Sequence, residues 1–365
     1  MIPLERRKRL TDAMVESNLD VMVVYGNAWQ NDYLRYVTDY GILEGEALAI
    51  IRRDGEVTIW LDSINEADRA QVEAPGIEVI YSPDMLSDVE NALHRSRNSR
   101  MGAAPYRMLP RRLAARKDDL KFSDETNFVD RFLMVKMQSE VEAVRRASRF
   151  ADEGYAVFRD AVRVGRYDYE LIAEIENFFR QKGVDDNFMI IGVGGPEVRG
   201  MAPPQGKIIK KGDLVTTELT PNLGGYYSQI CRTLVVGEAS PEQTNVFNIY
   251  CEALEAGIAT VKAGVTAGDV ARAENEVFRK NDLGVYVTSE YTRVRGHGMG
   301  LFVDTKPHIL EDVDTVLETG MTLIVHPNTY NPTVGYFVLG DALAVTDTGA
   351  DVFCKTPRAL FSVPA

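Results

Sequence analysis

The sequence predicts an α/β (α+β) protein of two domains, a small layered α/β domain followed by a domain with a curved antiparallel sheet beneath helices. Its 365 residues exceed the length at which a single hydrophobic core stops growing, so two cores are expected. Helical and strand-like patterns alternate in the first third, and strand-like patterns close the chain. Hydrophobic residues make up 45% and charged residues 26%, a balance typical of globular rather than disordered chains.

The first domain is expected over residues 1–132. Its segments alternate between a helical and a two-residue hydrophobic period, as in a layered α/β domain. We expect helices at 4–17 and 87–96 and strands at 21–26, 47–53, 56–61 and 77–82. The basic run Arg6, Arg7, Lys8 and Arg9 lies in the first helix, where we expect it to form a solvated face.

The second domain is expected over residues 133–365, and it opens with a long amphipathic helix at 139–162. Ser139 is the expected N-cap of this helix, because Glu142 follows three residues later as in a capping box. A second helix, at 167–183, should end at Gly183. Two more helices are expected at 241–261 and 267–280, and strands at 214–219, 226–237, 322–327, 335–346 and 350–354.

Charge and cysteine content bound the class of protein. A formal net charge of -13 argues against a nucleic-acid partner, because binding to phosphates needs clustered Lys and Arg. The three cysteines, Cys231, Cys251 and Cys354, are odd in number and widely spaced, which favours a reducing cytoplasm over a disulfide framework. No run approaches 18 apolar residues, so neither a signal peptide nor a membrane span is expected. We therefore expect a cytoplasmic protein with neither a nucleic-acid nor a membrane partner.

Histidines are scarce, and three of the four gather late in the chain. His297, His308 and His326 fall within thirty residues, whereas His94 lies on a polar helix and is expected at the surface. His297 has glycines on both sides, which allows backbone or ligand to approach closely. His326 ends an apolar strand. A histidine at a strand end is more often structural than catalytic, so a role in chemistry needs support from neighbouring residues.

Glu218 supplies that support, because it lies within a strand-like run. An acidic residue is unfavourable in a buried strand unless another group compensates its charge. Gln229 follows eleven residues later on what should be the neighbouring strand. Cys231 lies in the same run, where we expect a buried, inert thiol rather than a nucleophile.

Six segments in order resemble the creatinase, aminopeptidase P and methionine aminopeptidase group over residues 135–363. They are SEVEAVRRA, GDLV, GGYYSQICRTLVVG, GHGMG, EDVDTVLETGM and GYFVLGDALAVT. The resemblance implies an N-terminal creatinase-like domain and a C-terminal domain of the pita-bread fold. It also implies a homodimer in which the N-terminal domain of one subunit closes the pocket of the other, here with the segment 33–46, whose acids Asp39, Glu44 and Glu46 would favour a cationic substrate group.

Metallopeptidases of this group hold two metal ions with the ligands Asp, Asp, His, Glu and Glu, which polarise an amide and supply hydroxide. Carried over by motif, these positions are occupied by Glu218, Gln229, His297, His326 and Gly340. A second histidine of the group is replaced by Asp304. The two positions that bridge the metals hold a neutral amide and a glycine, so the repulsion between two divalent ions would lack compensation. The resemblance therefore implies a pocket without a dinuclear centre.

Three interpretations remain open. In the first, the protein is a creatinase-like hydrolase or lyase that cleaves a C–N bond of a small nitrogen-containing metabolite, with no cofactor. His297 or His326 then acts as general base, oriented by Glu218. Creatine itself is disfavoured, because the matching positions hold Cys231, Leu339 and Met201. The candidate substrate contacts are Tyr227, Gln229, Tyr291, Arg295, Asp304 and His308.

In the second interpretation, Glu218, His297 and His326 hold one divalent metal ion with open coordination positions. In the third, the fold serves as a non-catalytic binding module, since folds outlive their activities. Asp341 follows the glycine at the last ligand position, and we expect it to serve the structure or to replace the missing carboxylate.

Overall fold

The computed structural model describes residues 2–365. The chain forms two compact units, and the boundary between them in the sequence lies between Leu133 and Met134. That boundary lies one residue beyond the expected end of the first domain. Each unit has its own hydrophobic core. No helix within the described part of the chain is both long and apolar enough to cross a membrane.

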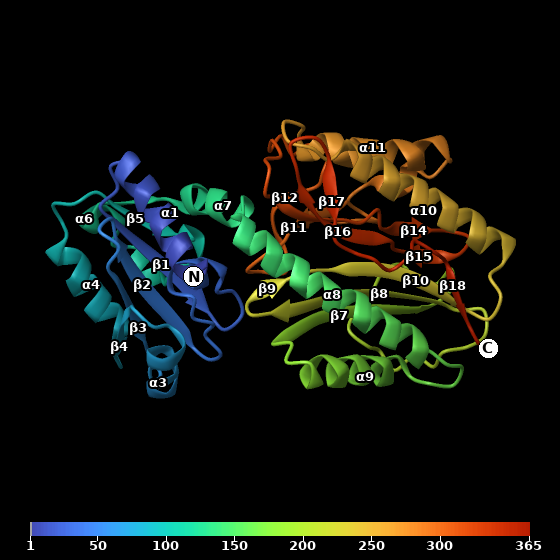
Figure 1. Cartoon of the computed structure of the whole chain (residues 1–365), viewed down its shortest axis with the longest axis horizontal. Coiled ribbons are helices and arrows are strands. Elements are labelled where there is room, and N and C mark those ends of the chain that lie inside the picture. The colour runs from blue at the N-terminus through green and yellow to red at the C-terminus, as the bar shows by residue number, and fades with distance from the viewer. Residues whose placement is uncertain (1) are drawn as a thin grey trace. The chain divides into compact units, whose positions relative to one another are not determined.

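The first unit is a six-stranded mixed sheet with helices packed on it (Figure 1). Its strand order is β4-β3-β2-β1-β5-β6, where the central β1 pairs antiparallel with β2 and parallel with β5. The strands are β1 (Val21–Asn27), β2 (Glu46–Arg52), β3 (Val57–Leu61), β4 (Glu78–Tyr81), β5 (Met101–Ala104) and β6 (Phe122–Asp124). The helices are α1 (Ile2–Glu16), α2 (Asp32–Thr38), α3 (Ile64–Glu73), α4 (Met85–Arg95), α5 (Arg111–Ala114), α6 (Lys117–Leu120) and α7 (Thr126–Met134).

The basic run at the start of α1 forms the expected solvated face only in part, since Lys8 is exposed but its two predecessors are not. Arg6 and Arg7 are buried. The guanidinium of Arg6 pairs with Asp39 and lies over the ring of Tyr36, 5.6 Å from its centroid. Charge composition alone could not reveal this partner, because Asp39 is 33 residues away in the sequence.

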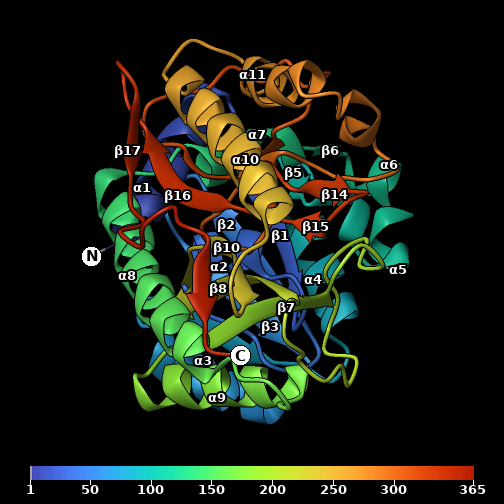
Figure 2. The same ribbon diagram turned by 90° about the vertical axis from the view of Figure 1, so that its right-hand side faces the viewer.

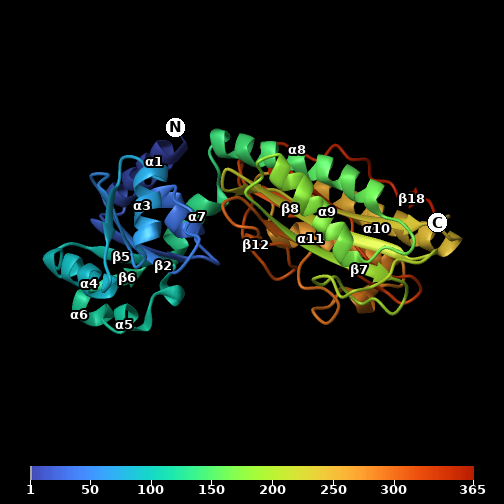
Figure 3. The same cartoon turned by 90° about the horizontal axis from the view of Figure 1, so that it is seen from below.

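The second unit is a curved, mostly antiparallel ten-stranded sheet covered by two helix pairs (Figures 1 and 3). The main strand order is β12-β11-β13-β16-β10-β8-β7. Outside this order, β17 pairs with β16, β18 with β10, and β9 with β8. The helix α8 (Gln138–Ala161) packs on β8 and β10, and α9 (Asp168–Gln181) packs on β7. On the other half, α10 (Pro241–Thr260) packs against α11 (Ala267–Lys280) and β13 (Figure 2).

The strands of this sheet are β7 (Asp186–Gly194), β8 (Leu214–Leu223), β9 (Tyr226–Tyr227), β10 (Ile230–Val236), β11 (Gly296–Gly298), β12 (Thr305–His308), β13 (Thr322–Val325), β16 (Gly340–Val345), β17 (Ala350–Val352) and β18 (Phe361–Val363). A separate hairpin pairs β14 (Thr329–Asn331) with β15 (Gly335–Phe337).

The structure corrects three local expectations. The long helix begins at Gln138, and Glu140 accepts a hydrogen bond from the N–H of Met137 at 3.0 Å, so the Ser139 cap was wrong. The strand expected at 226–237 is interrupted at Ser228 and Gln229, which lie between β9 and β10. The run at 335–346 contributes to two different sheets, because the chain leaves β15 before it enters β16.

Candidate active site

A cavity of about 550 Å³ lies in the second unit, where strands from both halves of the curved sheet meet the loops between them. The acid and base groups that line it include Glu218, His297, Asp304 and His326. The remaining lining residues are Phe188, Ile190, Arg199, Gly200, Met201, Gln229, Ser289, Glu290, Tyr291, Thr292, Arg293, Val294, Val303, Asn328 and Tyr336. The structure therefore brings together the three residues predicted to be catalytic.

Glu218 projects from the middle of β8 and is only 8% exposed. Its strand partner on β10 is Cys231, which in turn pairs with Gly340 on β16. Burial raises the pKa of Glu218 to about 7, although hydrogen bonding to Cys231 opposes the rise. At neutral pH this carboxyl can therefore either take up or release a proton.

Cys231 is fully buried and its thiol stays protonated, because burial and the charge of Glu218 raise its pKa. The side-chain amide of Gln229 donates to its sulfur at 3.3 Å. These contacts agree with a structural role for the thiol.

His297 lies on β11 with its imidazole oriented by a backbone contact. Its Nδ1 is 2.9 Å from the carbonyl oxygen of Gly298, which can only accept, so Nδ1 carries the proton. In the neutral imidazole the lone pair is then on Nε2, as a general base requires. Burial lowers the pKa of His297, and the nearby charge of Asp304 partly opposes this effect.

His326 follows β13 directly, and its backbone N–H donates to the carbonyl oxygen of Arg295 at 3.0 Å. Its ring meets that of His297 edge to face, with 5.3 Å between the centroids. Burial, and then His297, lower the pKa of His326 to about 3. His326 therefore stays neutral at physiological pH and is the weaker base of the two.

Asp304, and not Glu218, is the carboxylate that interacts with His297. Its Oδ1 lies 3.9 Å from Nδ1 of His297 and accepts a hydrogen bond of 2.9 Å from Nε2 of His308. Burial alone would raise the pKa of Asp304, but the hydrogen bond from His308 and the nearby His297 outweigh it and lower the pKa to about 2. Across residues 2–365, neither imidazole hydrogen-bonds to Glu218. The pairing of Glu218 with a histidine was thus predicted wrongly.

Three of the six predicted substrate contacts, Gln229, Tyr291 and Asp304, line the cavity. The other three do not. Tyr227 lies on β9, and its hydroxyl donates to Asp186 at 3.3 Å. Arg295 is 1% exposed and bonds to Asn275 and to the carbonyl oxygen of Asn328. His308 lies outside the cavity lining and hydrogen-bonds to Asp304.

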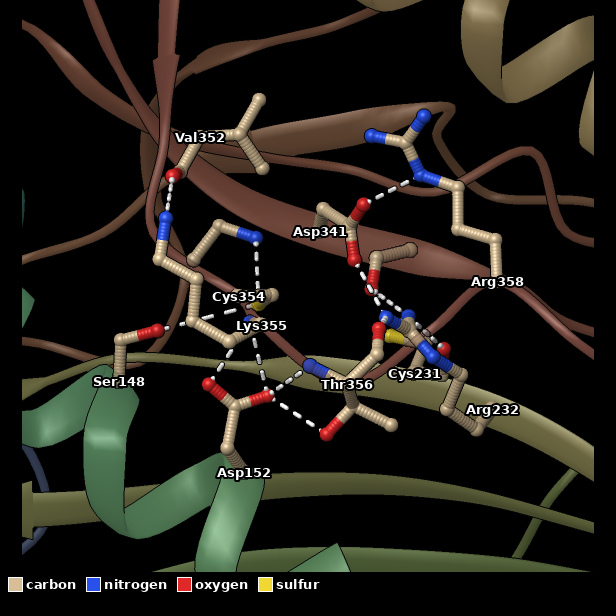
Figure 4. A network of polar contacts seen from close by, with 12 residues as sticks. Ser148, Asp152, Cys231, Arg232, Asp341, Val352, Cys354, Lys355, Thr356 and Arg358 are labelled. Carbon is tan, nitrogen blue, oxygen red and sulfur yellow. Dashed lines mark hydrogen bonds and ion pairs between the residues drawn. The ribbon is translucent and has the colours of Figure 1, made fainter.

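Asp341 serves the structure and does not replace a carboxylate at Gly340. It lies between two guanidinium groups, with Arg232 at 2.8 Å and Arg358 at 2.7 Å (Figure 4). Arg232 also donates to the carbonyl oxygen of Gly340 at 2.7 Å and to that of Thr356 at 2.8 Å. This network holds β10, β16 and the C-terminal segment together.

Sequence reasoning missed several residues that line the cavity, above all Tyr336, Arg199 and Asn328. Tyr336 belongs to a segment that was read as one continuous strand. Its break at Val338 and Leu339, between β15 and β16, was not visible in the hydrophobic pattern. Arg199 lies in the glycine-rich stretch after β7, whose path depends on its contacts with the β14–β15 hairpin.

Comparison with known proteins gives two family matches that together span most of the chain. The model of metallopeptidase family M24 matches residues 142–347, and that of the creatinase/prolidase N-terminal domain matches residues 6–135. An uncharacterized peptidase, YqhT, of Bacillus subtilis (strain 168) is 23% identical over 97% of this chain and 98% of its own length.

An Xaa-Pro dipeptidase of Pyrococcus furiosus is 28% identical over 62% of this chain, which spans 65% of that protein's length. Among solved structures, the X-Pro aminopeptidase of Thermotoga maritima MSB8 superposes with a TM-score of 0.88. The two are 21% identical, and the match covers 98% of this chain and 99% of that one. The latter likeness establishes the fold.

Proposed function

The chain belongs to metallopeptidase family M24, and from this premise we propose that it is a hydrolase of a C–N bond whose acid and base groups are its own side chains. The substrate is a small nitrogen-containing metabolite of the size that a cavity of about 550 Å³ admits. In using its own acid and base groups, the protein would resemble creatinase more than it resembles a peptidase with two metal ions.

The donor set in the cavity carries this proposal. Two divalent ions a few ångströms apart need shared carboxylates between them. Gln229 offers an amide already bonded to Cys231, and Gly340 offers no side chain. Within residues 2–365, no three His, Cys, Asp or Glu side chains form a group that could hold a metal ion. The residues present do not fit the dinuclear centre that the family name implies, so we derive no step through it.

The reaction is a hydrolysis in which His297 moves the proton. Its Nε2 takes a proton from water while the oxygen attacks the carbon of an amide, urea or guanidine group. The C–N bond then breaks, and the imidazolium returns the proton to the leaving nitrogen. The charge of Asp304 stabilises the imidazolium between these two transfers. Water and substrate are consumed, and an acid, or its urea-type equivalent, and an amine are released.

A homodimer is part of the proposal. In the first unit, Trp29 is 90% and Leu43 is 70% exposed, and the loops that carry them are joined by a hydrogen bond from Ala28 to Gly45. Large apolar side chains exposed together favour contact with another chain. We call the surface formed by Trp29 and Leu43 the exposed tip of the first unit. We place this tip at the pocket of a second copy of the chain, with Glu44 and Glu46 next to the tip. All three cysteines are free, which supports a cytoplasmic location.

The test combines metal analysis with a substrate screen. Purified protein is assayed for bound metals and incubated with Xaa-Pro dipeptides, cyclic and acyclic amides, ureas and guanidines, with and without a chelator. Hydrolysis of a non-peptide substrate that survives chelation is the expected result. Two ions per chain that are lost together with Xaa-Pro cleavage would restore the peptidase assignment.

Two other outcomes separate the alternatives. One stoichiometric ion lost together with activity would support a mononuclear site of Glu218, His297 and His326. A protein that binds a compound of the panel without turning it over would be a non-catalytic binding module.

A further inference from the structure

Tyr336 presents an unengaged hydroxyl to the cavity. It is 8% exposed and lines the same cavity as Glu218 and His297. Throughout residues 2–365, the structure contains no hydrogen bond from this hydroxyl to another residue. Buried tyrosine hydroxyls usually find a partner, because an unmade hydrogen bond is costly. The hydroxyl of Tyr155 is sealed from solvent without a partner, whereas that of Tyr336 remains accessible from the cavity and is free to bind a ligand.

The backbone of the β14–β15 hairpin holds this side chain in place. The N–H of Tyr336 donates to the carbonyl oxygen of Val198 at 2.8 Å. At the preceding Gly335, with φ at 101°, a Cβ atom would lie only 2.1 Å from the carbonyl oxygen of Gly195. The hairpin and the glycine-rich loop are therefore in direct backbone contact, and only glycine permits it.

The alternation of side chains along β15 sets the direction of Tyr336. The next residue, Phe337, packs into the core against Phe247 and Tyr250, with centroids 6.2 Å and 5.1 Å away. Successive side chains of a strand point to opposite faces. Tyr336 thus points away from the helices and into the cavity.

Tyr336 also lies near enough to Glu218 to feel its charge. Burial, and then the charge of Glu218, raise the pKa of its hydroxyl. A phenol is protonated at neutral pH even without such a shift, so the group acts as a donor.

We propose that Tyr336 is a catalytic residue whose hydroxyl donates a hydrogen bond to the oxygen or nitrogen that is double-bonded to the carbon under attack. This role rests on the proposed hydrolysis. As water adds to the carbon, the π electron pair moves onto that atom, and the hydroxyl of Tyr336 stabilises the developing negative charge. When the C–N bond breaks, the pair returns and Tyr336 is left unchanged. The phenol thereby supplies the polarisation that metal ions supply in a dinuclear centre.

Tyr286 is the matched control. It is not among the residues that line the cavity, and its ring packs against those of Tyr291 and Tyr330, at centroid distances of 5.0 Å and 5.8 Å. Loss of its hydroxyl leaves this packing intact. Tyr286→Phe should therefore leave kcat and the Michaelis constant within about threefold, because its hydroxyl donates to no developing charge.

The experiment compares Tyr336→Phe with Tyr286→Phe on the best substrate of the screen. Tyr336→Phe should lower kcat about 100-fold with little change in the Michaelis constant, as expected for loss of one oxyanion donor. A thioamide analogue of an amide substrate adds a second readout. Sulfur accepts hydrogen bonds weakly, so the wild type should lose more activity on this analogue than Tyr336→Phe does.

The outcomes separate the two proposals. An active wild type whose rate is unchanged by Tyr336→Phe would overturn the role of Tyr336 and leave the hydrolase intact. An inactive wild type on every compound of the screen would overturn both. A melting temperature of Tyr336→Phe equal to that of the wild type would exclude loss of folding as the cause of a slower rate.

Discussion

The Cβ atom of His326 lies 2.6 Å from the point where a Cβ atom on Gly340 would stand. The carbonyl oxygen of Val325 is 3.0 Å and the Cβ of Cys231 is 3.2 Å from the same point. A side chain at position 340 would force apart the strands that carry these three residues. The histidine and the glycine are thus packed against each other.

Gly340→Ala should destabilise the fold by about 1–3 kcal/mol, because a methyl group overpacks a site without free space. Gly349→Ala is the control, since no atom lies within 4 Å of its Cβ position. Urea unfolding measures both variants. Equal stability of the two would show that the strands at Gly340 separate freely.

Asp341→Asn should be far more damaging than loss of a surface ion pair. Arg232 and Asp341 are 0% and 3% exposed, and removal of one charge leaves the other buried without compensation, at a cost of about 3–5 kcal/mol. Asp12→Asn breaks the exposed pair with Lys8, where at most about 1 kcal/mol is expected. A similar midpoint shift for both variants in urea would contradict the importance of the network in Figure 4.

Lys136 should make the protein more stable as the pH rises above 8. Its ammonium is 7% exposed, and burial lowers its pKa from 10.5 to about 8. Between these pH values the unfolded chain holds the proton that the folded chain has lost, so stability increases with pH, by about 3 kcal/mol in total.

Lys136→Met lacks this titration, so its stability relative to the wild type is the measured quantity. The advantage of the variant should be greatest at pH 7 and should shrink by pH 10. A constant difference between the two proteins would show that Lys136 titrates normally in the fold.

His297→Gln should lower kcat by about 10²–10⁴-fold on any substrate that the protein hydrolyses, because the general base is lost. His326→Gln should have a smaller effect, since its imidazole stays neutral and lies beside the base. His94→Gln, an exposed residue of the first unit, controls for the substitution itself. A larger loss from His326→Gln would exchange the two roles.

Trp29→Ser should weaken self-association if the exposed tip of the first unit closes the pocket of a second copy. Val72→Ser removes another large apolar side chain, 80% exposed, from a different part of the same unit. Analytical ultracentrifugation would show a dimer for the wild type and Val72→Ser, and monomer for Trp29→Ser. Identical sedimentation of the three would remove Trp29 from the interface.

The sequence by itself determined the order of the elements and the family. Hydrophobic periodicity and capping signals are local properties of the chain, so the helices at 241–261 and 267–280 agree with α10 and α11 to within one residue. Six short motifs in the expected order were enough to identify the family, because each motif is a contiguous stretch of sequence that can be recognised without the tertiary structure.

Only the tertiary structure decided which side chains share the cavity. Tyr227 and Arg295 looked like substrate contacts, yet the strand break before Gln229 and the buried partners of Arg295 direct both elsewhere. Tyr336 carried no signal in the sequence, and it enters the cavity because a hairpin docks on a loop 140 residues earlier, at Gly195. Periodicity reports which face of an element is buried, but contacts between segments distant in the chain decide what each buried side chain meets.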